Sequence, residues 1–297
     1  MPLSSRHEHR WGCASMHPLV LGIPTYFFMW GFALLVYIPL ATHLARKDGF
    51  SVARASSALA LLAVLLFAGA KALYLLEAAW YPLDEPVPNP GARLLHGFRI
   101  PGGVIFIALL GPLTCRLVGL PWRDFGDSIV PAGALAIALI RVGCFFNGCC
   151  FGATTSLPWG LSFPRGSNVH WYHAAHGWIP AAAGQSLPVH PLQLYFVTAA
   201  AATTAALFWI RRHQLPPGRG QLIFYALFFG TTAFLEPLRA SPLTLNGLLV
   251  PAASLGAAGL ILGQILANGT AMEPTVGASR NTCAAQTVAR YRARTRP

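Results

Sequence analysis

The segment from 141 to 152, RVGCFFNGCCFG, gathers residue types that can bind or transfer a charged group. Arg141 follows a long run of alanine, leucine and isoleucine. A Gly-rich turn with Asn147, Gly148 and Gly152 comes after it. A guanidinium group beside an amide and exposed backbone N–H groups presents fixed, forked donors to a phosphate or a carboxylate. The segment therefore predicts a receptor for an anionic lipid headgroup; the alternative is a buried arginine that donates to carbonyl oxygens.

Three of the six cysteines lie in the same segment, at Cys144, Cys149 and Cys150. No CxxC pair occurs in the chain, so neither a zinc ribbon nor a thioredoxin-like motif is supported, and we expect no metal and no organic cofactor. Four roles for these thiols remain open. They could form a disulfide from Cys144 to one of the other two, fill space as small apolar groups, act as acyl or redox nucleophiles, or bind a metal together with a histidine.

A second candidate lies in VHPLQLYF, residues 189–196. Pro191 suits the first position of a helix, where its missing N–H costs nothing. His190 then lies at or next to the N-cap, and Gln193 and Tyr195 lie in the first turns. An imidazole ring at a helix N-terminus tends to stay neutral and can act as a base or a donor, whereas the alternative is a purely structural cap.

Lys71, Glu236 and Arg239 are further ionisable residues in or beside apolar runs. Such residues are costly in lipid and mark functional sites by default. Glu236 and Arg239 are spaced i, i+3 and would form an ion pair on one helix face, which favours a structural role. Lys71 would either extend its ammonium group toward the membrane surface or pair with a buried carboxylate.

These groups must be positioned by a chain whose composition is that of a membrane protein. It has 297 residues, of which 55% are hydrophobic and 10% are charged. Soluble domains carry about 25% charged residues, so this chain has too few to cover a surface that faces water. A net charge of +12 would suggest a nucleic-acid partner in a soluble protein, but here the basic residues flank apolar runs. We therefore expect them to set the membrane topology and to meet anionic lipid headgroups, with no nucleic acid as a partner.

Windows of roughly 20 apolar residues, the length that crosses a bilayer, predict an all-α integral membrane protein with seven transmembrane helices. The predicted spans are 25–45, 56–80, 102–120, 128–146, 191–210, 220–238 and 247–267. They form one membrane domain, residues 23–268, between an outer N-terminal segment (1–22) and a basic, disordered tail (269–297). No internal repeat supports an inverted-repeat transporter.

The distribution of basic residues predicts the orientation. The connections after the first, third and fifth spans, together with the tail, carry most of the lysines and arginines. The positive-inside rule then places the C-terminus in the cytoplasm and the N-terminus outside. Two long connections, 81–101 and 147–190, fall on the outer side and show no clear secondary structure, which is typical of functional or disordered loops. Their tryptophans suggest loops that rest at the lipid–water boundary (Trp80, Trp159, Trp171 and Trp178).

The order of these segments resembles the bacterial prolipoprotein diacylglyceryl transferase family. The family signature of arginine, asparagine and glycine is similar to RVGCFFNGCCFG, and its next motif is similar to LPWGLSFP (157–164). The family's His-Pro segment resembles HPLQLYF (190–196), and two further motifs resemble GAKALY (69–74) and RIPGG (99–103). Single residues that match family positions are Tyr26, Glu236 and Arg239. The resemblance covers residues 23–267.

The chain departs from the family pattern at several positions. The segment FIALLG (106–111) lacks the histidine that the family carries in its third helix. Cys144 and Cys149 stand where the family has asparagine and glutamate. Phe196 replaces a glutamate, and Thr232 replaces a second arginine. The retained set is mainly Arg141, Asn147, Gly152, His190, Gln193, Tyr195 and Arg239.

The resemblance implies a bacterial inner-membrane enzyme that moves the diacylglyceryl group of phosphatidylglycerol onto the lipobox cysteine of an exported prolipoprotein. It implies catalytic roles for Arg141 and Arg239 at the phosphate and for His190 as the base. Substrate-binding roles would fall to Tyr26, Arg141, Asn147, Gly148, Gly152, Gln193, Tyr195 and Glu236. Two alternatives remain. One is a family member without transferase activity that binds anionic phospholipid or lipoprotein, and the other is a thiol-dependent membrane enzyme that uses the three clustered cysteines.

Overall fold

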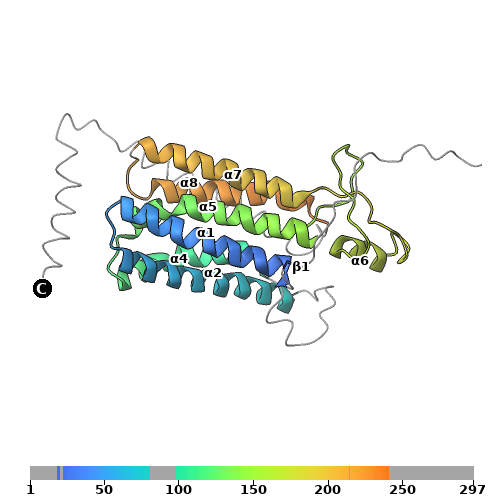
Figure 1. Ribbon diagram of the computed structural model, residues 1–297, viewed down its shortest axis with the longest axis horizontal. Helices are drawn as coiled ribbons and strands as arrows, with labels where there is room; N and C mark the ends of the chain where they lie inside the picture. Colours follow the sequence, from blue (N-terminus) through green and yellow to red (C-terminus); the bar gives the residue numbers. More distant parts are fainter. Residues whose placement is uncertain (1–18, 21–22, 81–97, 214, 241–297) are drawn as a thin grey trace, which may run out of the picture.

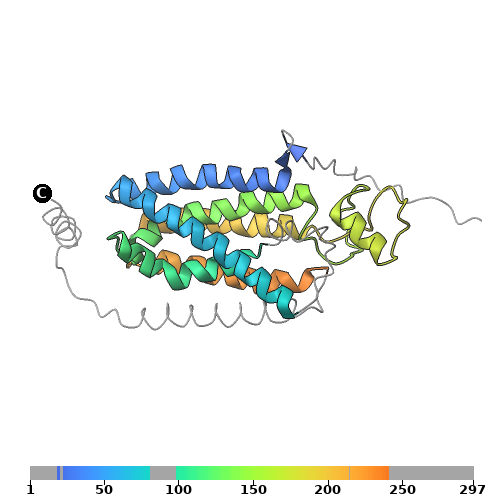
Figure 2. The same cartoon turned by 90° about the horizontal axis from the view of Figure 1, so that it is seen from below.

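Six long helices lie side by side along the longest axis of the protein in a computed structural model (Figure 1). The structure describes residues 19–20, 23–80, 98–213 and 215–240. The long helices are α1 (Thr25–Lys47), α2 (Val52–Trp80), α4 (Ile100–Leu117), α5 (Trp122–Asn147), α7 (Leu192–Ile210) and α8 (Arg219–Leu235). Each of the six is long and apolar enough to cross a membrane. Figure 2 shows from below that they form a bundle and not a single layer.

Six of the seven predicted spans coincide with these helices. The seventh, 247–267, and the predicted tail lie outside the described residues, as do most of the N-terminal segment and most of the connection 81–101. The short connections after α1, α4 and α7 lie at one end of the bundle, and the long segment after α5 lies at the other (Figure 1). This is the alternation that the spacing of the apolar runs predicts.

Helix α5 lies at the centre of the bundle and packs against α1, α7 and α8. In its apolar window 56% of the residues are buried, against 22% in α1. Small residues allow this close packing, because a Cβ added to Gly143 would lie 2.6 Å from the Cβ of Met29 in α1. The central helix is therefore the rigid element that carries Arg141 and Cys144.

Helices α2 and α4 pack through glycines. A Cβ added to Gly69 would lie 2.5 Å from the carbonyl oxygen of Gly102, and one added to Gly103 would lie 2.5 Å from the carbonyl oxygen of Leu66. Contacts of this length force the backbone to move, so these positions accept no side chain without a shift of one helix. The GAKALY and RIPGG motifs thus hold the two helices together.

Polar contacts join the helices at the end opposite the long segment. Arg211, in the short 3-10 helix η1 (Arg211–His213), donates from Nη2 to both carboxylate oxygens of Asp48, at 3.0 Å and 3.1 Å. Asp127 of α5 accepts the backbone N–H groups of Gly218 and Gln221, at 2.6 Å and 2.8 Å. These bonds satisfy N–H groups at the start of α8 that have no partner within the helix.

The long segment after α5 is folded, which differs from the expected irregular loop. It contains helix α6 (Asn168–Ala175), whose N-cap Ser167 accepts the N–H of His170 at 3.2 Å. Phe163, Val169 and Val189 form a small buried core. Short backbone pairings join the ends of the segment at Thr154–Val189, Leu161–Val189 and Pro164–Gln185. The sequence does not reveal these pairings, because each is a single isolated bridge and not part of a strand.

Two buried histidines stabilise this segment. Leu187 donates its N–H to Nδ1 of His173 at 3.2 Å, and Nε2 of His170 lies 2.8 Å from the carbonyl oxygen of Ala183. The expected tryptophan contacts with the membrane surface are consistent with exposed indole rings at Trp159, Trp171 and Trp178. A two-stranded hairpin, β1 (Leu19–Val20) and β2 (Ile23–Pro24), precedes α1.

Candidate active site

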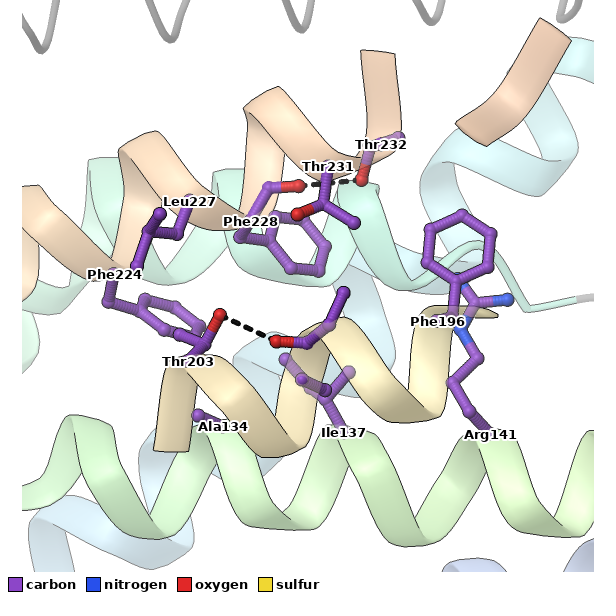
Figure 3. Close-up of a pocket in the computed structure, with 12 residues that line it drawn as sticks. Ala134, Ile137, Arg141, Phe196, Thr203, Phe224, Leu227, Phe228, Thr231 and Thr232 are labelled. Carbon is purple, nitrogen blue, oxygen red and sulfur yellow. Dashed lines mark hydrogen bonds between the residues drawn. The ribbon is translucent and has the colours of Figure 1, made fainter. Parts of the chain in front are cut away.

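Arg141 lies in α5, almost two turns before its end, and only 6% of its surface is exposed. The carbon at the centre of its guanidinium group lies 4.2 Å from the centre of the Phe196 ring on α7 (Figure 3). The two side chains meet where α5 and α7 face each other. Phe196 thus gives the Arg141 guanidinium group an aromatic face.

The Arg141 guanidinium lacks a hydrogen-bond partner at Nε among the described residues. The predicted alternative, donation to carbonyl oxygens, is not seen for this nitrogen within that part of the chain. A buried charge is costly unless an opposite charge or several hydrogen bonds compensate it. The ring of Phe196 offers no oxygen acceptor to the N–H groups of the Arg141 guanidinium. An anion with oxygen acceptors would supply hydrogen-bond partners for these donors.

A small pocket lies between α5, α7 and α8, with Arg141 at one end (Figure 3). Its lining is mostly apolar, with Ile137, Phe224 and Phe228 among the contributors. The hydroxyl group of Thr232 donates to the carbonyl oxygen of Phe228 at 2.8 Å. The pocket therefore has mostly apolar walls and one cationic end.

A second, larger pocket lies between α1, α2, α4, α5 and α8. Trp30, Tyr37 and Ile107 are among its lining residues, and the lining is almost wholly apolar. Ile107 belongs to the FIALLG segment, which contains no histidine. A proton acceptor on α4 is thus absent from the described lining of this cavity.

Three backbone segments that are far apart in the sequence meet at the C-terminal end of α5, the end that the basic residues predict to face outward. The N–H of Gly152 donates to the carbonyl oxygen of His190 at 3.0 Å, and the N–H of His190 donates to that of Ala153 at 3.0 Å. Ala153 in turn donates to the carbonyl oxygen of Leu238 at 2.8 Å. We call this meeting of residues 151–153, 189–190 and 238–240 the outer junction.

Glycine is required at the centre of the outer junction. A Cβ on Gly152 would lie 2.5 Å from the Cβ of His190 and 2.9 Å from the carbonyl oxygen of Leu238. The N–H groups of Gly148 and Gly152 donate to the carbonyl oxygens of Phe145 and His190. Both amides thus have backbone partners in this structure, and a contact of the two glycines with a phosphate stays a prediction.

Gln193 is buried and faces the turn after α5. Its Nε2 donates to the carbonyl oxygen of Cys149 at 2.7 Å, and its Oε1 has no partner among the described residues. Asn147 accepts a bond at its carbonyl oxygen from Nδ2 of Asn168, at 2.6 Å. These contacts fix the turn through its backbone, and neither of them brings Asn147 to Arg141.

His190 lies one residue before the N-cap of α7, which is Pro191. Its Nδ1 is 3.3 Å from the hydroxyl group of Tyr195, and that hydroxyl accepts a bond from Nε1 of Trp159 at 2.8 Å. The predicted base and the predicted tyrosine are thus neighbours. Trp159 was expected only as an anchor at the membrane surface, and the sequence gives no signal for its contact with Tyr195.

Glu236 and Arg239 form the predicted ion pair, through Nε with Oε1 and through Nη2 with Oε2 at 3.0 Å. The pair does not lie on a regular α-helix as expected. Glu236 begins the short 3-10 helix η2 (Glu236–Leu238), and Arg239 is extended and pairs with Gly152 at the outer junction. The turn changes the direction of the chain, so the guanidinium group also reaches the sulfur of Cys150.

Cys144, Cys149 and Cys150 are free thiols whose sulfur atoms all lie within 4.8 Å of one another. Contacts with the side chains of Cys144 and Cys149 lower the pKa of Cys150 well below its usual range, and the thiol of Cys149 donates to the carbonyl oxygen of Cys144 at 3.7 Å. Burial opposes this shift, and the charges of Arg239 and Arg141 support it. Tyr26, at the start of α1, lies near the three sulfurs. Two predicted site residues, Tyr26 and Arg239, thus lie close to the cysteine sulfurs.

Lys71 lies apart from these groups, on α2. Its ammonium nitrogen lies 4.7 Å from the centre of the Tyr74 ring and 5.3 Å from that of Phe98. These aromatic faces stabilise the cation at the edge of the bundle. The lysine is thus a structural feature of the α2–α4 pair.

Comparison with known proteins adds an independent finding. A family model described as prolipoprotein diacylglyceryl transferase matches residues 15–268. A phosphatidylglycerol–prolipoprotein diacylglyceryl transferase from Leifsonia xyli subsp. xyli is 31% identical over 194 residues, which are 60% of this chain and 55% of that protein. One from Cupriavidus necator is 31% identical over 208 residues, 67% of each chain. A protein from Clostridium perfringens with the same name and the number 2 is 26% identical over 250 residues, 84% of this chain and 91% of the relative.

Proposed function

The chain belongs to the prolipoprotein diacylglyceryl transferase family, a family of multi-pass bacterial membrane proteins, and on this basis we propose that it transfers a diacylglyceryl group from phosphatidylglycerol to the thiol of an exported prolipoprotein. The observation that carries the proposal is the buried Arg141, whose Nε lacks a partner among the described residues at one end of an apolar cavity. An acyl chain fits the apolar walls, and a phosphate compensates the charge.

In the proposed reaction, the thiolate of the lipobox cysteine attacks the glycerol carbon that bears the phosphate ester. The C–O bond breaks, a thioether forms, and glycerol phosphate leaves with the bonding electron pair. Arg141 stabilises the negative charge that develops on the leaving phosphate. Arg239 is the second candidate, although Glu236 already compensates much of its charge.

The thiol must lose its proton, because the thiolate is the nucleophile. His190 is the proposed base. With the proton held at Nδ1, where the oxygen of Tyr195 accepts it, the Nε2 lone pair of His190 is left to take the thiol proton. Trp159 supports this arrangement because its donation to Tyr195 fixes the position of the hydroxyl group.

A lipidation assay with purified protein, phosphatidylglycerol and a lipobox peptide tests the proposal. Arg141→Ala should lower the rate by about 100-fold or more, the range seen when one group that stabilises developing charge is removed. Membrane insertion should be unchanged. Arg165→Ala is the matched control, because Arg165 is exposed on the segment after α5 and should keep full activity. Equal rates for the two variants would refute the role of Arg141.

A second function is favoured by the apolar lining at Ile107, where the third helix lacks the family's histidine. In that case the protein binds anionic phospholipid and transfers nothing. Expression in cells depleted of their own transferase separates the two functions. Growth restored by the wild type and not by Arg141→Ala supports the enzyme. Absent growth, combined with Arg141-dependent binding of phosphatidylglycerol, supports the binding protein.

A further inference from the structure

The three clustered cysteines are not used by the proposed reaction. Cys144 is in the last turn of α5 and is 3% exposed, and Cys149 and Cys150 follow the end of that helix directly. All three sulfurs lie within 4.8 Å of one another. A disulfide would use two of them and leave the third without a purpose. Three sulfurs this close together can instead bind a single metal ion as three corners of a tetrahedral site.

The backbone of the turn is shaped to close this triangle. Gly148 caps α5 in the left-handed conformation, with φ of 65°. Cys150 has φ of 58° and is the only non-glycine residue with a positive φ in the described part of the chain. This conformation costs a residue with a Cβ roughly 1–2 kcal/mol. Because the two left-handed residues turn the chain back over the helix end, they bring the sulfurs of Cys149 and Cys150 to Cys144.

The size of the triangle fits a thiolate-bound ion. Zn²⁺ binds sulfur at about 2.3 Å, so two sulfurs of a tetrahedral site lie about 3.8 Å apart. The described sulfurs, within 4.8 Å of one another, reach this spacing through small side-chain rotations. Thiolate ligands select soft cations such as Zn²⁺ and Cu⁺ over Mg²⁺ or Ca²⁺.

We propose that Cys144, Cys149 and Cys150 form a three-thiolate binding site for Zn²⁺. The local charge favours this ion. Three thiolates and one Zn²⁺ carry a net charge of −1, beside the cationic side chains of Arg239 and Arg141, whereas Cu⁺ would leave a larger excess of −2. Arg239 is also paired with Glu236. The remaining thiol protons pass to water as the sulfur–zinc bonds form.

Neighbouring groups hold the three ligands in place. Gln193 donates to the carbonyl oxygen of Cys149, and the N–H of Cys149 donates to that of Cys144 at 3.1 Å. Such bonds around a metal site orient its ligands. Three protein ligands leave the fourth tetrahedral position to water or to a ligand from solution, as in zinc sites that act on a substrate. The proposal goes beyond lipid transfer and does not depend on it.

Metal retention by the purified full-length protein in detergent tests the proposal. The reduced protein is incubated anaerobically with Zn²⁺ or with Cu⁺, desalted and analysed for bound metal. We expect one zinc per chain in the wild type and in Cys115→Ser, whose buried cysteine lies on α4. Cys144→Ser and Cys150→Ser should each lose it. Zinc retained equally by all four proteins, or retention of copper alone, would overturn the proposal.

Alkylation of the wild type gives a test that needs no variant. Zinc should protect Cys144, Cys149 and Cys150 together from alkylation, as read by peptide mass, and a chelator should remove the protection. Co²⁺ in place of Zn²⁺ should add thiolate-to-metal charge-transfer bands to the absorption spectrum. Unchanged alkylation with zinc, or a disulfide between Cys144 and a neighbour in protein isolated from cells, would contradict the site.

Discussion

The guanidinium group of Arg141, whose Nε has no hydrogen-bond partner in the described part of the chain, has a consequence for stability. A buried guanidinium without an anion destabilises the folded chain, and a bound phosphate group removes that penalty. We expect phosphatidylglycerol to raise the melting temperature of the wild type in detergent. A ligand at about 100 times its Kd stabilises the folded state by about 2.7 kcal/mol. Arg141→Met should melt at the same or a higher temperature without lipid and should gain nothing from phosphatidylglycerol.

The exposed arginine again provides the control. Arg165→Met should respond to phosphatidylglycerol as the wild type does, and phosphatidylcholine, which has no net charge, should stabilise neither protein. A lipid response of Arg141→Met equal to that of the wild type would show that the anion binds elsewhere.

His173 makes the segment after α5 sensitive to pH. Burial lowers the pKa of His173, and the charges of His176 and His170 add to the effect. The unfolded chain, with a histidine pKa of about 6.5, therefore binds more protons than the folded chain below that pH. Stability is constant above about pH 6.5 and falls as the pH drops from there toward the lower pKa of the folded state.

Hydrogen exchange of the Leu187 amide, corrected for intrinsic rates, measures this effect because that N–H donates to Nδ1 of His173. Exchange of the Leu187 amide should become faster as the pH is lowered from about 7 to about 5.5. His173→Asn, which keeps an acceptor but does not titrate, should flatten the dependence. His43→Gln, at an exposed position of α1, should leave it unchanged.

The sequence predicts the residues near the site better than it predicts their contacts. The predicted pair Glu236–Arg239 and the neighbours His190 and Tyr195 are present. The cysteine triangle could not be read from the spacing, which contains no CxxC pair, because it depends on the left-handed conformation of Cys150. The proposed zinc site thus departs from the expectation that no metal is bound.

At the scale of elements, the glycine contact between α2 and α4 gives a sharp prediction. Gly102→Ala should destabilise the protein by about 1–3 kcal/mol, the range for overpacking, because the added methyl meets the backbone of Gly69. Gly31→Ala on α1 is the matched control, since nothing lies within 4 Å of an added Cβ there. Thermal unfolding in one detergent compares them, and equal melting temperatures would contradict the account.

Hydropathy was sufficient to predict the six described spans because each long helix must cover its own backbone polar groups in lipid. It was insufficient for the segment after α5. That segment folds around only three buried residues, Phe163, Val169 and Val189, and around histidines whose burial depends on distant backbone groups. Isolated polar side chains give no periodic signal.

For the whole molecule, the orientation in the membrane remains a prediction from the basic residues. At the end of the bundle with the short connections, the described basic residues include Arg46, Lys47, Arg116 and Arg211. We expect that end to face the cytoplasm. Alkaline phosphatase inserted at Arg165 should be active, and green fluorescent protein fused after Pro297 should fluoresce. The opposite result for either reporter would reverse the topology or change the number of spans.

The outer junction also sets a time for assembly during synthesis. Gly152 and Ala153 cannot complete their contacts until Leu238 and Arg239 have been translated. At about 5–20 residues per second, the ribosome needs on the order of ten seconds to make that stretch of chain. Throughout this interval the nascent protein contains Arg141 and the three clustered cysteines without the backbone contacts that residues 238 and 239 supply. Ribosome release before residue 239 would leave a membrane-inserted but permanently incompetent fragment.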